Sequence, residues 1–336
     1  MKKLNESMET VNCDFCRSDN YLKVVEQTDI IHRVTEQVFS VVKCNNCGLH
    51  YTNPRPNRSD IGNFYGSNYS FHGGSSIKMF IKDKLGHFIK WFANSPLAII
   101  FILIPPVSKI LVSQVKPHVE DPVLPILKRG DVSNFLDIGC GSGRLAHFWG
   151  RHSAIVNCSK YANCYAVEPD DNSRSDLDKS KIKSWSVISK VDQGLLFDVI
   201  RMNWSLEHVH SPTEYFSFIN NRLTEEGIAV ICIPNNEGLL YKLAPKCMEL
   251  PIHLYHFSLD DIKSYADKFH LEISDFKTFS YPAMYTFAAK QNLLPSFSFV
   301  NNILQAQNTQ KVLNCFDEVG LGNDMIITLR KRKISK

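Results

Sequence analysis

Short apolar runs alternate with helical patterns along the chain from about residue 131 onward. The runs are rich in β-branched and aromatic residues, which favour strands, whereas the segments between them have apolar residues at helical spacing. The pattern predicts strands at 134–139, 165–169, 197–204, 227–235, 271–280 and 324–332, with a weaker candidate at 185–188. Strands that alternate with helices in this way predict a doubly wound, mostly parallel α/β sheet.

The segment SLDDIKSYADKF begins with a capping pattern. Ser258 precedes the apolar periodicity, and Asp261 follows where the first helical turn would lie. A serine hydroxyl and an acid at this spacing can satisfy amides that have no partner within the first turn. We therefore expect a helix that begins just after Ser258.

Two regions with other patterns precede this α/β region, which we assign to residues 131–336. Residues 1–70 contain two Cys-x-x-Cys pairs, and residues 71–130 are apolar, dotted with lysine and broken by prolines. We expect residues 71–130 to form a helical connecting region. Its apolar part, 77–112, either covers the protein's own core or contacts a membrane peripherally. The longest apolar run, 97–104, is much shorter than the about 20 residues of a spanning helix.

Composition and charge are those of an ordinary globular protein. The chain has 336 residues, of which 44% are hydrophobic and 21% charged, and a net charge of +4. This charge is too small to predict nucleic-acid binding by itself. The polar start, MKKLNESMET, lacks the apolar centre of a secretion signal, so we expect a cytoplasmic protein. In a reducing compartment, paired cysteines are more often metal ligands than disulfides.

The two Cys-x-x-Cys pairs predict a zinc ribbon. Cys13 and Cys16 form the first pair, Cys44 and Cys47 form the second, and the interval between the pairs is long enough for a β-hairpin. Four thiolates around one tetrahedral ion leave no open position, so the zinc would be structural. The alternative is that the four cysteines are unliganded core residues.

Three glycines follow the strand expected at 134–139, before a helical pattern. In FLDIGCGSGRL, Gly139, Gly141 and Gly143 provide a backbone that can adopt positive φ angles or approach a ligand closely. Their spacing, G-x-G-x-G, differs from the dinucleotide fingerprint G-x-G-x-x-G, and no G-K-[ST] follows as in a P-loop. The loop therefore predicts a ligand other than a typical dinucleotide or nucleoside triphosphate.

Two acids narrow the choice of ligand. Asp137, just before the loop, would repel a pyrophosphate but could hold a cation, directly or through water. Glu168 ends the next strand, where a carboxylate can accept hydrogen bonds from both hydroxyls of a ribose. S-adenosylmethionine combines an amino-acid end, a ribose and a positive charge, so we predict it as the cofactor. A nicotinamide cofactor and a glycine turn without a ligand are the alternatives.

The segments FLDIGCGSG, YAVEP, FDVIRMNWSLEHV and GIAVICIPN follow one another like the motifs of class I S-adenosylmethionine-dependent methyltransferases, which residues 131–285 resemble. The resemblance implies a Rossmann-like methyltransferase sheet with an antiparallel last strand. It implies that Glu168 binds the ribose and that the methionine end is lined by Asp137, Gly139, Cys140, Gly141 and Gly143. The interval between Asp137 and Glu168 is long for this family, and the acid usually found near the adenine is missing, with Asp192 as a stand-in.

The front of the chain extends the resemblance. A cysteine ribbon followed by GLHYTNPRP and IGNFYGSNYS is similar to the N-terminal module of bacterial methyltransferases from deoxysugar and surface-polysaccharide pathways. In those enzymes, tyrosines from this segment can reach the acceptor, which makes Tyr65 and Tyr69 candidates here. The sugar C-methyltransferases of this group have a further large C-terminal domain that this sequence does not contain.

The segment SLEHV places Glu207 and His208 after the strand expected at 197–204, at the sheet edge where ligands bind. An imidazole beside a carboxylate is suited to take the acceptor's proton, so we predict both as catalytic residues. In many members of the resembling family this histidine instead shapes the pocket or approaches the cofactor. His253 and His256 form a second pair that would overhang the acceptor, unless His256 serves a helix start.

These observations predict methyl transfer from S-adenosylmethionine to a small-molecule acceptor, a sugar or surface-polysaccharide precursor. The first alternative is an RNA methyltransferase that holds RNA with its zinc ribbon. The small net charge and the segment NWSLEH, in place of an Asn-Pro-Pro-Tyr motif, argue against it. The second alternative is a cofactor-binding module of the same fold that has lost the chemistry.

Overall fold

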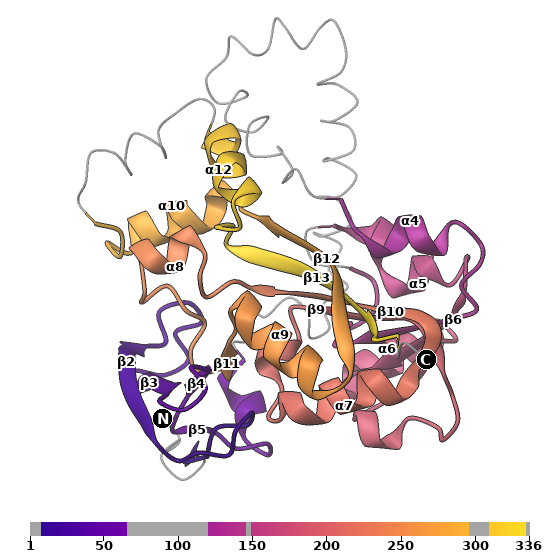
Figure 1. Cartoon of the computed structure of the whole chain (residues 1–336), viewed down its shortest axis with the longest axis horizontal. Helices are drawn as coiled ribbons and strands as arrows, with labels where there is room; N and C mark the ends of the chain where they lie inside the picture. Colours follow the sequence, from indigo (N-terminus) through magenta and orange to yellow (C-terminus); the bar gives the residue numbers. More distant parts are fainter. Residues whose placement is uncertain (1–7, 66–119, 146–148, 296–308, 334–336) are drawn as a thin grey trace, which may run out of the picture.

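The computed structural model describes residues 8–65, 120–145, 149–295 and 309–333, and its main element is a seven-stranded sheet (Figure 1). The spatial order of the strands is β12-β13-β10-β9-β6-β7-β8. In chain order they are β6 (Asn134–Ile138), β7 (Asn163–Val167), β8 (Lys183–Trp185), β9 (Phe197–Asn203), β10 (Leu223–Pro234), β12 (Leu271–Phe279) and β13 (Asp324–Lys331).

The pairing of these strands confirms the predicted fold class. Strands β8, β7, β6, β9 and β10 pair in parallel, whereas β13 runs antiparallel to both β10 and β12. The last strand is thus antiparallel, as the resemblance implies, and the weak candidate near residue 185 is the edge strand β8. The chain starts the sheet at β6, leaves through β7 and β8, and returns to β9 on the other side. The carboxyl ends of β6 and β9 therefore flank the switch point where such sheets bind ligands.

Helices cover both faces of the sheet. Successive residues of a strand point to opposite faces, so apolar residues in a row give the sheet two apolar faces that must be buried. Leu136 and Ile138 share a buried cluster with residues of α7 and α9, whereas Phe135 shares another with residues of α4, α5 and α6. The helices are α4 (Val123–Leu127), α5 (Ile155–Cys158), α6 (Asp171–Lys179), α7 (Pro212–Arg222), α8 (Leu239–Leu243), α9 (Leu259–Lys268), α10 (Pro282–Lys290) and α12 (Thr309–Glu318).

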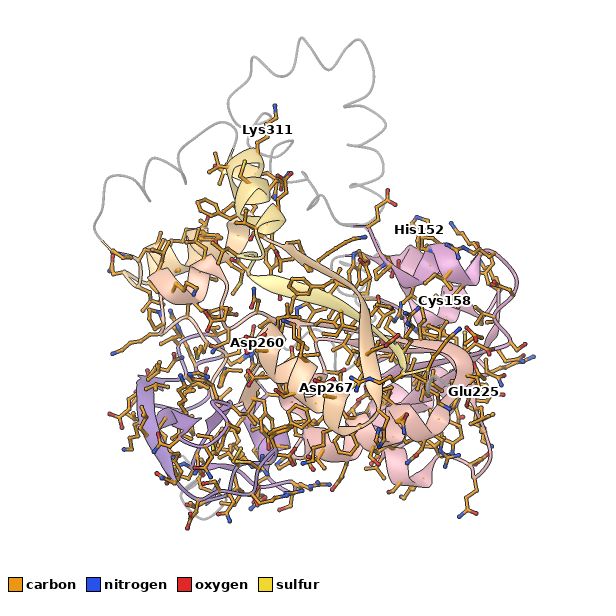
Figure 2. All side chains as sticks on the ribbon, in the orientation of Figure 1. His152, Cys158, Glu225, Asp260, Asp267 and Lys311 are labelled. Carbon is orange, nitrogen blue, oxygen red and sulfur yellow. The ribbon has the colours of Figure 1, made fainter. Side chains whose placement is uncertain are left out.

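Helix α9 begins at the predicted capping box. The Ser258 hydroxyl accepts a hydrogen bond from the amide of Asp261 at 3.2 Å, and the Asp261 carboxylate accepts one from the amide of Ser258 at 2.8 Å. Tyr265 is buried on the inner face of the helix, while Asp260 and Asp267 are exposed to solvent (Figure 2). The amphipathic pattern thus orients the helix as well as starting it.

The predicted ribbon is a small antiparallel sheet. Strands β2 and β3 form the hairpin between the two cysteine pairs, and β4 pairs with β3. The fourth strand, β11, comes from the α/β region after β10 and completes the order β11-β4-β3-β2. The bounds are β1 (Met8–Glu9), β2 (Tyr21–Thr28), β3 (Val38–Cys44), β4 (His50–Thr52), β5 (Arg55–Pro56), which pairs with β1, and β11 (Tyr255–His256).

The ribbon shares its core with the α/β sheet. Tyr51 of β4 belongs to the same buried cluster as residues of β6, β9 and β10. The carboxylate of Asp14, between the first two cysteines, accepts hydrogen bonds from the hydroxyls of Ser211 and Tyr265 at 2.8 and 2.9 Å. The ribbon expected at 1–70, described here as far as residue 65, is therefore built into the larger fold.

Most of the expected connecting region lies outside the described residues. Of residues 71–130 the structure describes 120–130, which contain α4, and the segment 77–112 falls outside, as does Tyr69. Within the described ranges, no helix combines the length and apolar character that a membrane crossing would need.

A buried ion pair joins β6 to β9. Asp137 lies opposite Arg201 in the parallel register, and the guanidinium donates to both carboxylate oxygens at 3.1 and 2.5 Å. Arg201 also donates to the carbonyl of Ser153 at 2.8 Å, and Asp121 lies 3.9 Å away. Arg201 and Asp137 are almost completely buried, so each charge makes the other tolerable in the core.

We expect Arg201→Met to lower the free energy of unfolding by about 3–5 kcal/mol, because it leaves the charge of Asp137 buried without a partner. The double variant Asp137→Asn/Arg201→Met should recover most of that loss. As a control, Arg330→Met removes an exposed ion pair with Glu272 and should cost at most about 1 kcal/mol. Urea unfolding measures all three variants, and equal losses for the two single variants would contradict the argument.

Candidate functional site

The glycine loop follows β6 directly, and its backbone needs glycine. The φ angles are +77° at Gly139, +58° at Gly141 and +72° at Gly143, a range that other residues rarely adopt. A Cβ at Gly139 would lie 2.6 Å from the Cβ of Ser205, and one at Gly143 would lie 2.5 Å from Leu177. Gly139 and Gly143 therefore serve the turn and its packing, whereas Gly141 sits between them at the tip.

The next feature is the packing of the glycine loop and the path of the chain after it. Cys140 is buried within the cluster of α4, α5 and α6. Residues 141–142 form a turn and 143–144 a bend, and 146–148 lie outside the described residues. A helix that begins at Gly143, as the pattern predicts, is not found in the described part of this segment. The chain instead continues through a 3₁₀ turn, Arg151–Ser153, into α5.

Glu168 lies beside the loop at the end of β7. Its two carboxylate oxygens accept hydrogen bonds from the amides of Gly141 at 2.8 Å and Asp170 at 3.0 Å, and the side chain is buried. A carboxylate can accept about four hydrogen bonds, so these two amides leave capacity for ribose hydroxyls. The donor set therefore fits the ribose of S-adenosylmethionine, and Glu168 also fixes the tip of the loop.

Asp137 lies beneath the loop, where the resemblance places the methionine end. Both of its oxygens are engaged by Arg201, so its charge is already compensated. A cation would therefore interact with the pair of Asp137 and Arg201 together, and not with an isolated carboxylate. Bound S-adenosylmethionine would supply an electrophilic methyl group, and the residues described here would position and screen it.

Glu207 and His208 form a 3₁₀ turn, Leu206–His208, just after β9. The Glu207 side chain is 1% exposed, and neither carboxylate oxygen has a hydrogen-bond partner among the described residues. Burial raises the pKa of Glu207 well above its usual range. Its backbone carbonyl accepts a hydrogen bond from Leu254 at 2.7 Å, which ties the turn to the segment before β11. Burial thus favours the protonated, neutral form of Glu207 beside His208.

His208 is held by its Nδ1 atom, which lies 3.0 Å from the carbonyl oxygen of Ile252. A carbonyl can only accept, so Nδ1 has the proton and Nε2 has the free lone pair. The Tyr65 hydroxyl lies 3.4 Å from Nδ1, and Nε2 lies 4.0 Å from Glu207. Burial, together with the repulsion that His208 and His253 would exert on each other when both are protonated, lowers the pKa of His208 to about 3, so the ring is neutral at physiological pH.

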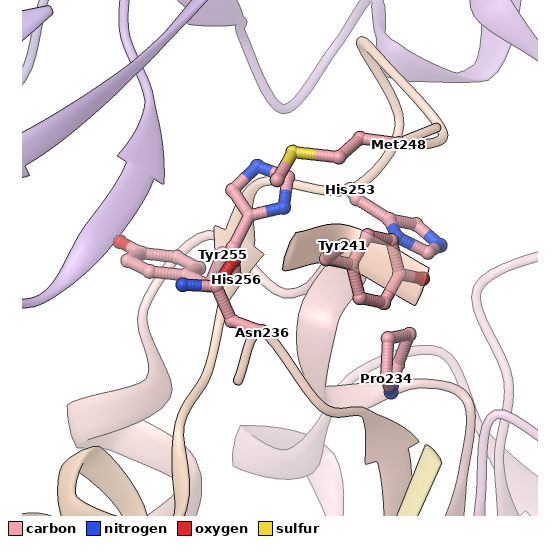
Figure 3. A pocket seen from close by; sticks show the side chains of 7 residues that line it. All are labelled: Pro234, Asn236, Tyr241, Met248, His253, Tyr255 and His256. Carbon is pink, nitrogen blue, oxygen red and sulfur yellow. The ribbon is translucent and has the colours of Figure 1, made fainter. Parts of the chain in front are cut away.

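The two histidines of the second predicted pair, His253 and His256, have different roles. His253 lines a small pocket with Pro234, Asn236, Tyr241, Met248, Tyr255 and His256 (Figure 3). Its ring meets the ring of His208 edge to face, with centroids 4.7 Å apart. His256 lies in β11, buried, with Nε2 3.2 Å from the hydroxyl of Thr52. His253 therefore joins the site, and His256 holds β11 to the ribbon.

The four cysteines of the ribbon converge. The sulfur atoms of Cys13 and Cys47 are 3.4 Å apart, those of Cys16 and Cys44 are 3.5 Å apart, and all four lie within 4.8 Å of one another. Zinc–sulfur bonds of about 2.3 Å in a tetrahedron require similar separations. After each pair the chain turns through a positive φ, +66° at Arg17 and +87° at Gly48. This donor set fits one structural zinc ion, held by two knuckles.

The sheet order, the glycine loop and the acid after the second strand together define a class I S-adenosylmethionine-dependent methyltransferase domain. Comparison with protein families supports this class: the model of a family described as "Methyltransferase domain" matches residues 111–275. The matched residues are thus an S-adenosylmethionine-dependent methyltransferase domain. No curated protein sequence matches it.

Solved structures with low identity align with the chain. One is an S-adenosylmethionine-dependent methyltransferase from Clostridium acetobutylicum, with 13% identity, a TM-score of 0.39, and 63% of this chain and 89% of that chain covered. Another is an O-methyltransferase from a polyketide synthase of Brevibacillus brevis, with 14% identity, a TM-score of 0.41, and coverage of 70% and 78%. The N-methyltransferase NodS from Bradyrhizobium japonicum has 12% identity, a TM-score of 0.38, and coverage of 63% and 86%. None of these likenesses bears on the acceptor.

Sequence reasoning missed several residues of the site. Arg201 is the clearest, because an arginine inside the apolar strand FDVIRMNW requires a buried counter-charge, and Asp137 supplies it. Glu249 and His32, which approach His253, have no motif around them. Asp192 was the substitute for the acid expected near the adenine. It lies between β8 and β9 and forms a surface ion pair with Lys183 of β8.

We expect one zinc ion per chain, and Cys44→Ser should release it. Apparent binding energies of about 10–16 kcal/mol are folding energy in such sites, so the ribbon should unfold and the shared core should weaken. Cys315→Ser, at an exposed cysteine outside the cluster, is the matched control and should keep the zinc. Elemental analysis and circular dichroism measure both effects; metal-replete protein without zinc would disprove the assignment.

We expect Glu168→Ala to weaken binding of S-adenosylhomocysteine by about 1–3 kcal/mol, through lost hydrogen bonds to a charged group. Glu168→Gln keeps the shape but cannot accept at both ends, and should fall between wild type and alanine. Glu272→Ala, at the edge of the sheet, is the control. Titration calorimetry gives the affinities, and wild-type binding by Glu168→Ala would refute the cofactor site.

Proposed function

We propose that this enzyme transfers a methyl group from S-adenosylmethionine to a small hydroxylated acceptor, a sugar or surface-polysaccharide precursor, and that His208 takes the acceptor's proton with Glu207 beside it. The observation behind this proposal is the pairing of a free imidazole lone pair with a buried carboxylic acid that has no partner among the described residues, at the carboxyl end of β9. Methyl transfer is an in-line displacement, so a site that orients the acceptor and removes its proton supplies much of the acceleration.

The polar groups around His208 suit an acceptor with several hydroxyls. Glu207 can donate and accept as a neutral acid, the Tyr65 hydroxyl approaches from the ribbon, and Asn236 and Tyr241 line the adjoining pocket. The similarity of the ribbon and of the segment GLHYTNPRP to methyltransferases of deoxysugar and polysaccharide pathways points to the same class of acceptor.

An assay with [methyl-³H]S-adenosylmethionine and a fractionated extract of the source cell tests this function. Label should enter a fraction of small carbohydrate compounds, and hydriodic acid should release it as volatile methyl iodide if the product is an O-methyl ether. Label that resists release indicates C-methylation. Transfer to RNA fractions, or no transfer with intact cofactor binding, would refute the proposed acceptor class.

We expect His208→Ala to lower the transfer rate about a hundredfold or more while leaving the affinity for S-adenosylhomocysteine nearly unchanged. The reason is that the base is lost and the loop and Glu168 are not. His152→Ala, at an exposed histidine, should keep the wild-type rate. If His208→Ala instead loses cofactor affinity and keeps its rate at saturating cofactor, the histidine shapes the pocket.

A further inference from the structure

A row of titratable side chains continues from His208 away from the sheet. The ring of His253 faces that of His208, and Nε2 of His253 lies 3.6 Å from Oε2 of Glu249. The same oxygen of Glu249 lies 3.4 Å from Nε2 of His32. Three side chains, those of His253, Glu249 and His32, therefore link the candidate base to the ribbon.

The backbone holds this row in place. Glu249 and His253 share one turn, closed by a hydrogen bond from the amide of His253 to the carbonyl of Glu249 at 2.9 Å. Thr52 of β4 binds the carbonyl of His253 through its hydroxyl at 2.7 Å. His32 lies between β2 and β3, where its amide donates to Asp29 at 2.8 Å. The ribbon thus supplies both the partner of Glu249 and the anchor of its turn.

The charges differ along the row. Burial opposes ionisation of Glu249, but the hydrogen bond from His32 and the nearby His253 and His208 outweigh it and lower its pKa to about 2. Burial lowers the pKa of His253. Glu249 is therefore an anion at neutral pH. On its sheet side lie the neutral imidazoles of His253 and His208, whereas on its ribbon side the hydrogen bond with Glu249 raises the pKa of His32.

Four other titratable groups lie near this row of side chains: Glu207, Tyr65, Asp324 and Asp29. Burial raises the pKa values of Glu207 and Tyr65 above their usual ranges. Burial also raises the pKa of Asp324 to about 7, and its carboxylate accepts a hydrogen bond from the indole of Trp204 at 2.9 Å. Asp29 faces His32.

A neutral imidazole with a low pKa has an available lone pair, but it is a weak base because its positive form is poorly stabilised. We propose that Glu249, held by His32 from the ribbon, is the positioning residue that fixes the proton of His253 on Nε2 and stabilises the positive charge that His208 acquires during catalysis. The proposal rests on the proposed function, because it takes His208 as the base.

The proton balance of the step is as follows for a hydroxyl acceptor. The O–H bond breaks and its proton moves to Nε2 of His208, while the oxygen electron pair forms the bond to the methyl carbon. The electrons of the methyl–sulfur bond stay on sulfur. The new positive charge lies on His208, next to His253, and the anion of Glu249 attracts it through the facing ring.

The first test needs no acceptor. The full-length, zinc-loaded protein with ¹⁵N-labelled histidine and bound S-adenosylhomocysteine is examined by NMR at pH 7.5, where ¹⁵N shifts report which ring nitrogen has the proton. The signals are assigned from His208→Gln and His253→Gln. We expect His253 as the Nε2–H tautomer and His208 as the Nδ1–H tautomer. A His253 ring protonated on Nδ1 would overturn the proposal.

Glu249→Gln should also change the titration of His32. The hydrogen bond that His32 donates to the Glu249 carboxylate raises the pKa of His32, so removing the charge should lower that pKa. Glu225→Gln, at an exposed carboxylate paired with Lys331, is the matched control and should leave it unchanged. An unchanged midpoint for His32 in Glu249→Gln would contradict an ionised Glu249.

The second test uses the tritium assay and its active extract fraction. Glu249→Gln should lower the transfer rate about tenfold or more at an unchanged affinity for S-adenosylhomocysteine, and should move the acidic limb of the pH–rate profile to lower pH, because the imidazoles lose the anion that favours their charged form. Glu249→Asp keeps the charge and should restore part of the rate. If His208→Ala is inactive but Glu249→Gln keeps both rate and limb, the proposed function stands and this inference fails.

Discussion

The hydrogen bonds between Thr52 and the segment just before β11 hold the candidate site together. The amide of Thr52 donates to the carbonyl of Leu254 at 2.9 Å, and its hydroxyl donates to the carbonyl of His253 at 2.7 Å. The same segment donates from Leu254 to Glu207. One short piece of backbone therefore joins the ribbon, the turn of Glu249 and the end of β9. If it moved, His208 would lose both its carbonyl partner and its facing ring.

Buried charged groups hold the other part of the candidate site, the glycine loop, in place. Asp137 and Arg201 compensate each other under the glycine loop, and Glu168 fixes the tip of the loop through the amide of Gly141. These groups are held by hydrogen bonds within the protein, so the loop side of the site is pre-organised. Glu207 differs, because its carboxyl group has no partner among the described residues. Glu207 thus has polar capacity for a substrate on the side where we propose that the acceptor binds.

Local patterns predicted the fold well, because the strands alternate cleanly with helices and Ser258 starts α9 as its spacing indicates. They also located the cysteines, which the structure brings together around one point. Patterns could not place β11, because two residues have no periodicity and their partner strand lies far away in the sequence. The roles of Glu249 and His32 depend on that same long-range pairing. Arg201 was predictable in principle, since a lone arginine in an apolar strand needs a counter-charge.

The central claim is that the cysteine ribbon, with the zinc ion expected in it, is part of the candidate site and not an appended module. Hydrogen exchange read by mass spectrometry, with and without zinc chelation, tests it most directly. Removal of zinc should release protection in residues 8–65 and, to a similar degree, in 249–256 and 205–208, while β6 and β7 remain slow. If 249–256 exchanges as slowly without zinc as with it, while the ribbon is unfolded, the ribbon does not hold the site and the account is wrong.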